Sequence, residues 1–197
     1  MASSVIEICN NALSELKADT IMALTEDSDN ARRCNQRWPA VRDSVLASHP
    51  WNCAMTQAEL AASATAPVWK WDYAYPLPAD CLRVFEVVDS SENPIASWEV
   101  QGRQILCDEA GPIFISYAHK LLDPTKYDAL LDEALTYALA ARLAYPITAS
   151  TTQQQAMWTL FENILKQARG VDARQGTADP VTDSTWLHAK LGTRSLG

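Results

Sequence analysis

Apolar residues recur at helical spacing in four stretches of the chain and alternate with polar residues in the region between them. Residues 3–17 and 28–48 form one pair of amphipathic segments, and residues 123–145 and 150–169 form a second pair. Spacings of three and four residues place apolar side chains on one face of a helix. The pattern therefore predicts about four helices, in two pairs on either side of a different kind of structure.

The most regular helical stripe lies in residues 28–48, and a proline falls inside it. Pro39 removes a backbone donor and bends a helix, but the stripe continues beyond it. The sequence therefore predicts a kinked helix rather than an interrupted one. The apolar members of the stripe are Ala31, Cys34, Trp38, Val41 and Val45.

The ends of the helices carry recognisable signals. Ser4, either Ser28 or Asp27, and Ser150 are placed to cap the starts of three helices. Asp123 with Pro124 predicts the start of the fourth, as an N-cap followed by proline at the first helical position. Pro146 is predicted to end that helix. A last turn containing Arg169 and Gly170 is predicted to end the final helix.

Residues 51–120 have the short alternating runs and turn residues of an antiparallel sheet. Gln101-Gly102-Arg103 has the composition of a hairpin turn between two such runs. One run carries aromatic residues at every second position, which predicts a strand with four aromatic side chains on one face. These aromatic residues are Trp69, Trp71, Tyr73 and Tyr75.

These elements predict an α+β protein: a bundle of about four helices with an inserted small antiparallel β-sheet and an extended C-terminal arm. Residues 1–50 form the N-terminal helical pair, and residues 51–120 form the β-rich insert. Residues 121–170 form the second helical pair, which completes the bundle. Residues 171–197 form the arm, because they are largely polar and rich in turn-forming residues.

The predicted arm nevertheless carries large apolar residues, namely Trp186, Leu187 and Leu191. Two interpretations stay open. These side chains pack back onto their own domain, or they anchor an arm that becomes ordered on a partner. We favour the second interpretation, in which the arm docks on a neighbouring subunit or on another protein.

The charge balance argues against a general nucleic-acid-coating role and leaves open that nucleic acid passes by. The chain has 16 lysines and arginines against 24 aspartates and glutamates, for a net charge of −8. DNA-binding proteins normally have a basic footprint, whereas an acidic wall repels phosphate and suits a conduit. Four arginines gather in the second helix: Arg32, Arg33, Arg37 and Arg42. They form either a solvated helix face or a subunit interface that pairs with acidic surface on the next protomer.

No catalytic, cofactor-binding or metal-binding motif is recognisable. The five cysteines are odd in number and have no CxxC spacing, and His49, His119 and His188 are far apart in the sequence. No glycine-rich phosphate loop is present. A thiol-dependent enzyme, with Cys53 or Cys107 beside His119, is kept as an alternative. The sequence shows neither a signal peptide nor an apolar stretch long enough to span a bilayer. We therefore expect a soluble protein made in the cytoplasm.

Several runs of residues resemble a known family. Residues 11–54 contain N-A-L, T-E-D-S, V-R-D and H-P-W-N in that order. Residues 71–87 contain Y-P-L-P-A-D-C-L-R-V, and the similarity resumes over residues 111–148. In combination these runs resemble the tail tubular protein A family, the head-to-tail adaptors of short-tailed bacteriophages. Lys17 departs from the pattern, because many relatives have glycine after the first helix.

The resemblance implies a structural virion protein and no enzyme. Members of this family form a ring, usually a dodecamer, beneath the portal, present a platform for the tail nozzle and let genomic DNA pass through the centre. The implied partners are further copies of the chain, the portal protein and the nozzle protein, with no cofactor, no membrane and no specific DNA binding. The implied location is the head–tail junction, after assembly in the host cytoplasm. Another virion stopper or tail-completion protein is the alternative within the same class.

Overall fold

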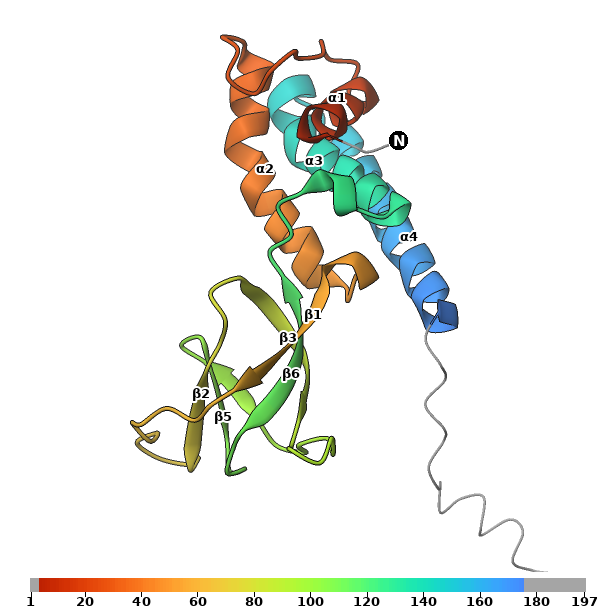
Figure 1. Ribbon diagram of the computed structural model, residues 1–197. Helices are drawn as coiled ribbons and strands as arrows, with labels where there is room; N and C mark the ends of the chain where they lie inside the picture. Colours follow the sequence, from red (N-terminus) through yellow and green to blue (C-terminus); the bar gives the residue numbers. More distant parts are fainter. Residues whose placement is uncertain (1–3, 176–197) are drawn as a thin grey trace, which may run out of the picture.

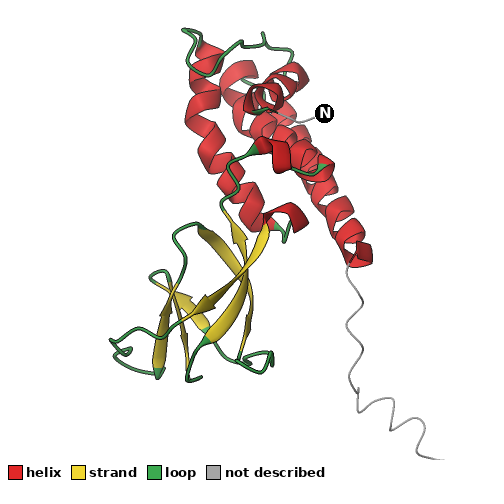
Figure 2. Cartoon of the chain, viewed as in Figure 1, coloured by secondary structure: helices red, strands yellow, loops and turns green. Residues whose placement is uncertain are grey.

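The computed structural model describes the fold of residues 4–175 and has an α+β architecture of two units. The helical unit is made of α1 (Val5–Glu15), α2 (Asp29–Ser48), α3 (Ala129–Thr148) and α4 (Thr151–Gln175). The β unit is inserted between α2 and α3 and lies at one end of the helices (Figures 1 and 2). The predicted order of helical pair, β insert and helical pair is confirmed.

The insert holds two antiparallel sheets of three strands each, rather than the single small sheet that the sequence predicted. One sheet has the order β1-β6-β3 and the other has the order β2-β5-β4. The hairpin between β4 and β5 turns at Gly102 and Arg103, which both have positive φ. The strands are β1 (Met55–Leu60), β2 (Tyr73–Pro76), β3 (Cys81–Val88), β4 (Glu99–Gln101), β5 (Gln104–Cys107) and β6 (Ile113–His119).

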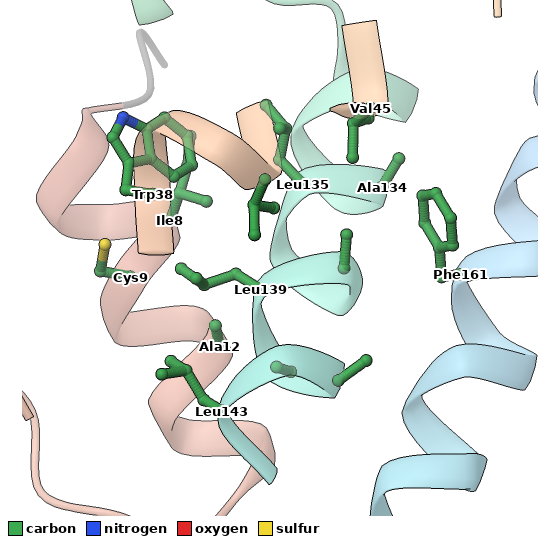
Figure 3. Packing of buried hydrophobic residues seen from close by; sticks show 14 of the residues in the cluster. Ile8, Cys9, Ala12, Trp38, Val45, Ala134, Leu135, Leu139, Leu143 and Phe161 are labelled. Carbon is green, nitrogen blue, oxygen red and sulfur yellow. The ribbon is translucent and has the colours of Figure 1, made fainter. Parts of the chain in front are cut away.

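Helix α3 is the centre of the helical unit, with α1, α2 and α4 all packed against it. Leu135, Leu139 and Leu143 of α3 are fully buried and point toward α1 (Figure 3). On another side of α3, Ala134 faces Phe161 of α4. Small alanine side chains let neighbouring helices approach closely, so the alanine-rich run of α3 fits its central position.

The predicted capping serines are confirmed. In each case the side-chain hydroxyl accepts a hydrogen bond from the backbone amide three residues further on, which satisfies a donor that the helix leaves unpaired. The three pairs are Ser4 with Glu7 at 3.1 Å, Ser28 with Ala31 at 3.2 Å, and Ser150 with Gln153 at 3.2 Å.

Three predicted helix boundaries are wrong. Asp123 caps a short 3-10 helix, η2 (Pro124–Lys126), and Asp128 caps α3 instead. Helix α3 also continues past Pro146 to Thr148, because a proline in the last turn removes only one backbone donor from an otherwise packed helix. Helix α4 continues past Gly170 to Gln175, since a single glycine costs only about 1 kcal/mol relative to alanine.

The β unit has a hydrophobic core of its own, separate from that of the helices. Tyr75, Ile105 and Ile113 are fully buried there, between the two sheets. The predicted aromatic strand is shorter than expected, because β2 begins only at Tyr73 and Trp69 lies in the preceding loop. A 3-10 turn, η1 (Asn52–Ala54), leads from α2 into the first strand.

Polar contacts join the two units. Asp43 near the end of α2 forms an ion pair with Lys120, which follows β6, with 3.0 Å between Oδ2 and Nζ. Arg83 of β3 donates a hydrogen bond to the carbonyl of Ala47 at 3.2 Å. The His119 ring nitrogen Nδ1 lies 2.9 Å from the carbonyl of Ala54. The orientation of the β unit therefore depends on specific side chains of β3 and β6 against the end of α2.

Candidate interaction surfaces

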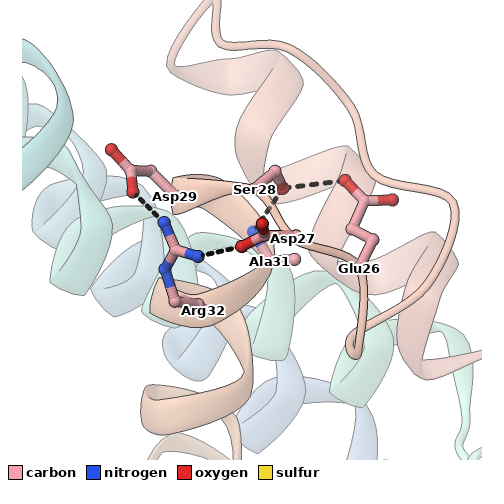
Figure 4. A network of polar contacts seen from close by, with 6 residues as sticks. All are labelled: Glu26, Asp27, Ser28, Asp29, Ala31 and Arg32. Atoms are coloured by element: carbon pink, nitrogen blue, oxygen red, sulfur yellow. Dashed lines mark hydrogen bonds and ion pairs between the residues drawn. The ribbon is translucent and has the colours of Figure 1, made fainter.

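The structure separates the four arginines of α2 into three environments. Arg32 is half exposed and pairs with Asp27 and with Asp29, the latter at 2.6 Å between Nη2 and Oδ1 (Figure 4). The two carboxylates near the start of the same helix therefore compensate the charge of Arg32. As an exposed pair of this kind contributes about 0–1 kcal/mol, the contact orders the side chain more than it stabilises the fold.

Arg42 is buried, and the prediction that it lies on a solvated or subunit-facing surface is wrong. The residue is 8 % exposed. The guanidinium pairs with Asp43 at 2.7 Å, and the same carboxylate also pairs with Lys120 of the β unit. The three charges belong to the junction between the units, where removing one leaves another incompletely compensated.

Arg33 and Arg37 remain as the subunit-interface candidates. They lie four residues apart, so they share one face of α2. Both side chains are partly exposed, and neither forms an ion pair with any residue that the structure describes. The carboxylate of Asp29 lies close enough to Arg33 that its pKa is lowered by the hydrogen bond and charge of Arg32 and then by the charge of Arg33. This face of α2 consequently presents two arginines that form no ion pair with residues 4–171.

The connector between α1 and α2 is held by its own side chains. Glu26 accepts hydrogen bonds from the backbone amides of Met22 at 2.7 Å and Ala23 at 3.2 Å, and from the Ser28 hydroxyl at 2.7 Å (Figure 4 shows the Ser28 contact). The Ser28 hydrogen bond first, and then the Met22 amide, hold the pKa of Glu26 below its usual value. The ordered connector presents Met22 with 88 % of its surface exposed.

The loop between β1 and β2 carries the most exposed apolar residues of the β unit. Val68 is 100 % exposed and Trp69 is 78 % exposed. The loop borders an open cavity of about 470 Å³ whose lining also includes Trp71 and Glu99. An exposed tryptophan is a candidate for an interaction site, because tryptophan is enriched among the residues that carry most of the binding energy at protein interfaces.

This loop is anchored rather than free along its length. Lys70, which has a positive φ of 73°, forms an ion pair with Glu99 of β4 at 2.9 Å and lies over the ring of Trp71. The amide of Asp72 donates to the carboxylate of Asp108 at 3.1 Å. The alternating aromatic residues predicted a strand where the structure has this loop. Pro67 and the small residues before it were a signal of non-strand structure.

The thiols and imidazoles do not form a nucleophile pair in the described part of the chain. Cys53 lies against the carboxylate of Asp128, with 3.5 Å between Sγ and Oδ2, while His119 faces the Ala54 carbonyl. Burial raises the pKa of Cys53 to about 11 and also raises the pKa of Cys107. A raised pKa lowers the thiolate fraction and is the opposite of what an activated thiol needs.

The apolar residues of the predicted arm lie outside the described residues, and the described residues hold neither a metal-ligand cluster nor a membrane-spanning helix. Trp186, Leu187 and Leu191 of the predicted arm are beyond residue 175, and residues 171–175 belong to α4 rather than to an extended arm. Within residues 4–171, no group of three or more metal-ligating side chains comes together. Among the described helices, none is both long enough and apolar enough to cross a bilayer.

Comparison with known proteins gives no assignment. No protein-family model matches the chain, and no curated protein sequence matches it. The functional argument therefore depends on the residues and their geometry.

Proposed function

We propose that this protein is a ring-forming head-to-tail adaptor of a short-tailed bacteriophage, located at the head–tail junction of the virion. It would join the portal to the tail nozzle and line the channel through which DNA leaves. The proposal starts from the resemblance of residues 11–54, 71–87 and 111–148 to the tail tubular protein A family.

The observation that carries the proposal is the position of the family-like residues in the structure. Trp51 of the H-P-W-N run is 1 % exposed, and its indole donates to the Val45 carbonyl at 2.9 Å, which fixes the exit from α2. Asp80 accepts a hydrogen bond from Tyr117 at 3.3 Å, and Arg83 reaches α2 from β3. The Arg83 contact joins the β unit to α2, while the Trp51 and Asp80 contacts fix the exit from α2 and the interior of the β unit, as a rigid connector requires.

The distribution of exposed apolar residues supports a role in linking different partners. Met22 lies on the α1–α2 connector of the helical unit, whereas Val68 and Trp69 lie on a loop of the β unit. Each is presented by a loop that hydrogen bonds or ion pairs hold in place. Preordered apolar side chains lose little conformational entropy on binding, so they suit permanent contacts in an assembly.

The net charge of −8 supports passage of DNA without specific binding. Negative surface along a channel repels the phosphate backbone and so keeps DNA from adhering during ejection.

The test is to mix the purified protein with portal rings and, separately, with nozzle assemblies, and to image the particles by electron microscopy. We expect rings stacked coaxially on the portal. A chain truncated after Gln175 should keep its helical content and lose portal binding, because the predicted arm would be absent. Binding to a different virion ring alone would favour a stopper or tail-completion protein, and binding to no ring would contradict the proposal.

A paired substitution tests the contribution of the β-unit loop. V68S/W69S removes the exposed apolar surface there, and M22S is the matched control at the helical unit. We expect V68S/W69S to fold normally and to lose binding to one of the two ring partners, while M22S leaves that same contact intact. Unchanged binding of V68S/W69S to both rings would exclude the loop as a docking site.

A further inference from the structure

Two arginines, Arg33 and Arg37, place like charges four residues apart on one face of α2. Like charges at this spacing on a helix repel each other. Arg32 and Arg42 of the same helix form ion pairs with carboxylates, whereas Arg33 and Arg37 form no ion pair with residues 4–171, although Asp29 lies near Arg33. We call the surface formed by Arg33 and Arg37 the basic face of α2.

A groove of the opposite charge lies elsewhere on the helical unit. It has a volume of about 350 Å³ and runs between α1 and the first turns of α3. Three carboxylates line it, namely Glu15 of α1 and Asp132 and Glu133 of α3, together with the ring of Tyr137. We call this surface the acidic groove.

The carboxylates of the acidic groove act on the pKa of Tyr137, which also lines the groove. Partial burial raises the pKa of Tyr137 above its usual value, and the charges of Glu15 and then Glu133 add to the rise. Neither glutamate forms an ion pair with a residue that the structure describes. The charges of Glu15 and Glu133 therefore have no ion-pair partner among residues 4–171, and those of Arg33 and Arg37 have none there either.

The two surfaces belong to different parts of the helical unit, since no residue of α2 lines the acidic groove. In Figure 1, α2 forms the left edge of this unit, whereas α1 and the start of α3 lie to its right. Both α1 and α2 pack against α3, and no described ion pair joins the basic face to the acidic groove. Two complementary patches that lie apart on one protomer can pair only between protomers, which generates a head-to-tail interface that can close into a ring.

We propose that the basic face of α2, through Arg33 and Arg37, docks against the acidic groove of a second copy of this chain, through Glu15 and Glu133. Charge identifies the partner of the basic face as a second copy of the chain. Copies with a net charge of −8 repel one another unless opposite charges meet locally. Guanidinium groups match carboxylates with paired donors, which fixes the register of successive protomers. This pairing rests on the proposed ring function and specifies which surfaces build the ring.

Charge exchange tests the pairing directly. R33E/R37E reverses the basic face, and E15R/E133R reverses the acidic groove. Each variant alone should self-associate at least about tenfold more weakly than the unaltered chain, as measured by sedimentation velocity and electron microscopy. An equimolar mixture of the two variants should assemble again, because an alternating ring restores an attractive contact at every interface. A chain that carries all four substitutions should also assemble.

Matched controls change the same amount of charge at other exposed positions. K166E/R169E on α4 mirrors the first variant, and E7R/E162R mirrors the second. Both controls should assemble like the unaltered chain. Circular dichroism verifies that every variant folds, and recovery in the mixture shows that neither loss of assembly was a folding defect.

The outcomes separate the pairing from the proposed function. Assembly that persists in both charge-reversed variants, or that the mixture does not restore, overturns the pairing and leaves the adaptor function standing. Normal self-association of R33E/R37E with loss of portal binding assigns the basic face to the portal and also overturns the pairing. An unaltered chain that self-associates at no concentration, alone or on portal rings, overturns both proposals.

Discussion

The side chain of Asn10 binds the backbone of Ile21 in both directions. Its amide nitrogen donates to the Ile21 carbonyl at 2.9 Å, and its amide oxygen accepts from the Ile21 amide at 2.8 Å. One helical residue thus satisfies both polar groups of a connector residue that is itself 2 % exposed. The contact ties the connector to α1 and sets the position of the loop that presents Met22.

Replacing Asn10 with alanine should lower the free energy of unfolding by about 1–3 kcal/mol, because two hydrogen bonds are lost and the backbone groups of Ile21 are left unsatisfied. Urea unfolding followed by circular dichroism measures the change. Asn11→Ala is the control, since Asn11 is the exposed neighbour in the same helix and undergoes the same change in helix propensity. Equal effects of the two substitutions would show that the bridge adds nothing to stability.

Lys17 occupies a backbone conformation that favours glycine. Its φ is 56°, and the end of α1 forms the hydrogen bonds of a Schellman motif, from Lys17 to Ser14 and from Ala18 to Leu13, both at 3.0 Å. Lys17→Gly should therefore raise the free energy of unfolding by about 0.5–1 kcal/mol. Glu15→Gly, inside the last turn of α1, should lower it by a similar amount. Destabilisation by Lys17→Gly in the same urea titration would contradict this account.

The connector should weaken at acid pH. The pKa of Glu26 is depressed below its ordinary value of 4.5 by the Ser28 and Met22 hydrogen bonds. A depressed carboxyl pKa gives stability that is fully present above pH 4.5 and is lost as the pH falls through the lower, folded-state pKa. Glu26→Gln should therefore flatten the fall in stability below pH 4.5, measured as the unfolding midpoint in urea against pH.

Glu162→Gln supplies the control for that pH series, because Glu162 lies on the exposed face of α4, outside the connector. Its profile should follow that of the unaltered chain. A Glu26→Gln profile that coincides with both would mean that the connector network makes no contribution to acid sensitivity.

The thiols should react slowly in the folded protein. Cys9, Cys34, Cys81 and Cys107 are buried, and a pKa of about 11 leaves roughly 0.1 % of Cys53 as thiolate at pH 8. Alkylation with iodoacetamide, followed by mass spectrometry, should be at least about 100-fold slower per site than in urea. A single cysteine that is alkylated rapidly in the folded state would revive the thiol-dependent enzyme as an alternative.

Local sequence signals predicted the helices well and their ends less well. Ser4, Ser28 and Ser150 cap helices as expected, because an N-cap depends on a residue and the amide three positions later. Pro146 and Gly170 lie within helices against expectation. Their local cost is small beside the packing of α3 and α4, which no short window of sequence contains.

The candidate surfaces were only partly predictable. Arg33 and Arg37 are partly exposed, whereas Arg42 is covered at the junction with the β unit. Alternation placed Trp69 in a strand, but β2 begins at Tyr73 and leaves Trp69 on a loop. In both cases the deciding contacts come from residues distant in the chain, such as Lys120 and Glu99.

The sequence by itself determined the α+β class, the order of helices and insert, and the antiparallel pairing, because periodicity and turn chemistry act over a few residues. Only the tertiary structure decided that the insert forms two sheets, that Arg42 is buried and that the acidic groove lies apart from the basic face of α2. Those features depend on which surfaces meet when distant segments pack, and burial and charge pairing are properties of that packing rather than of any local stretch.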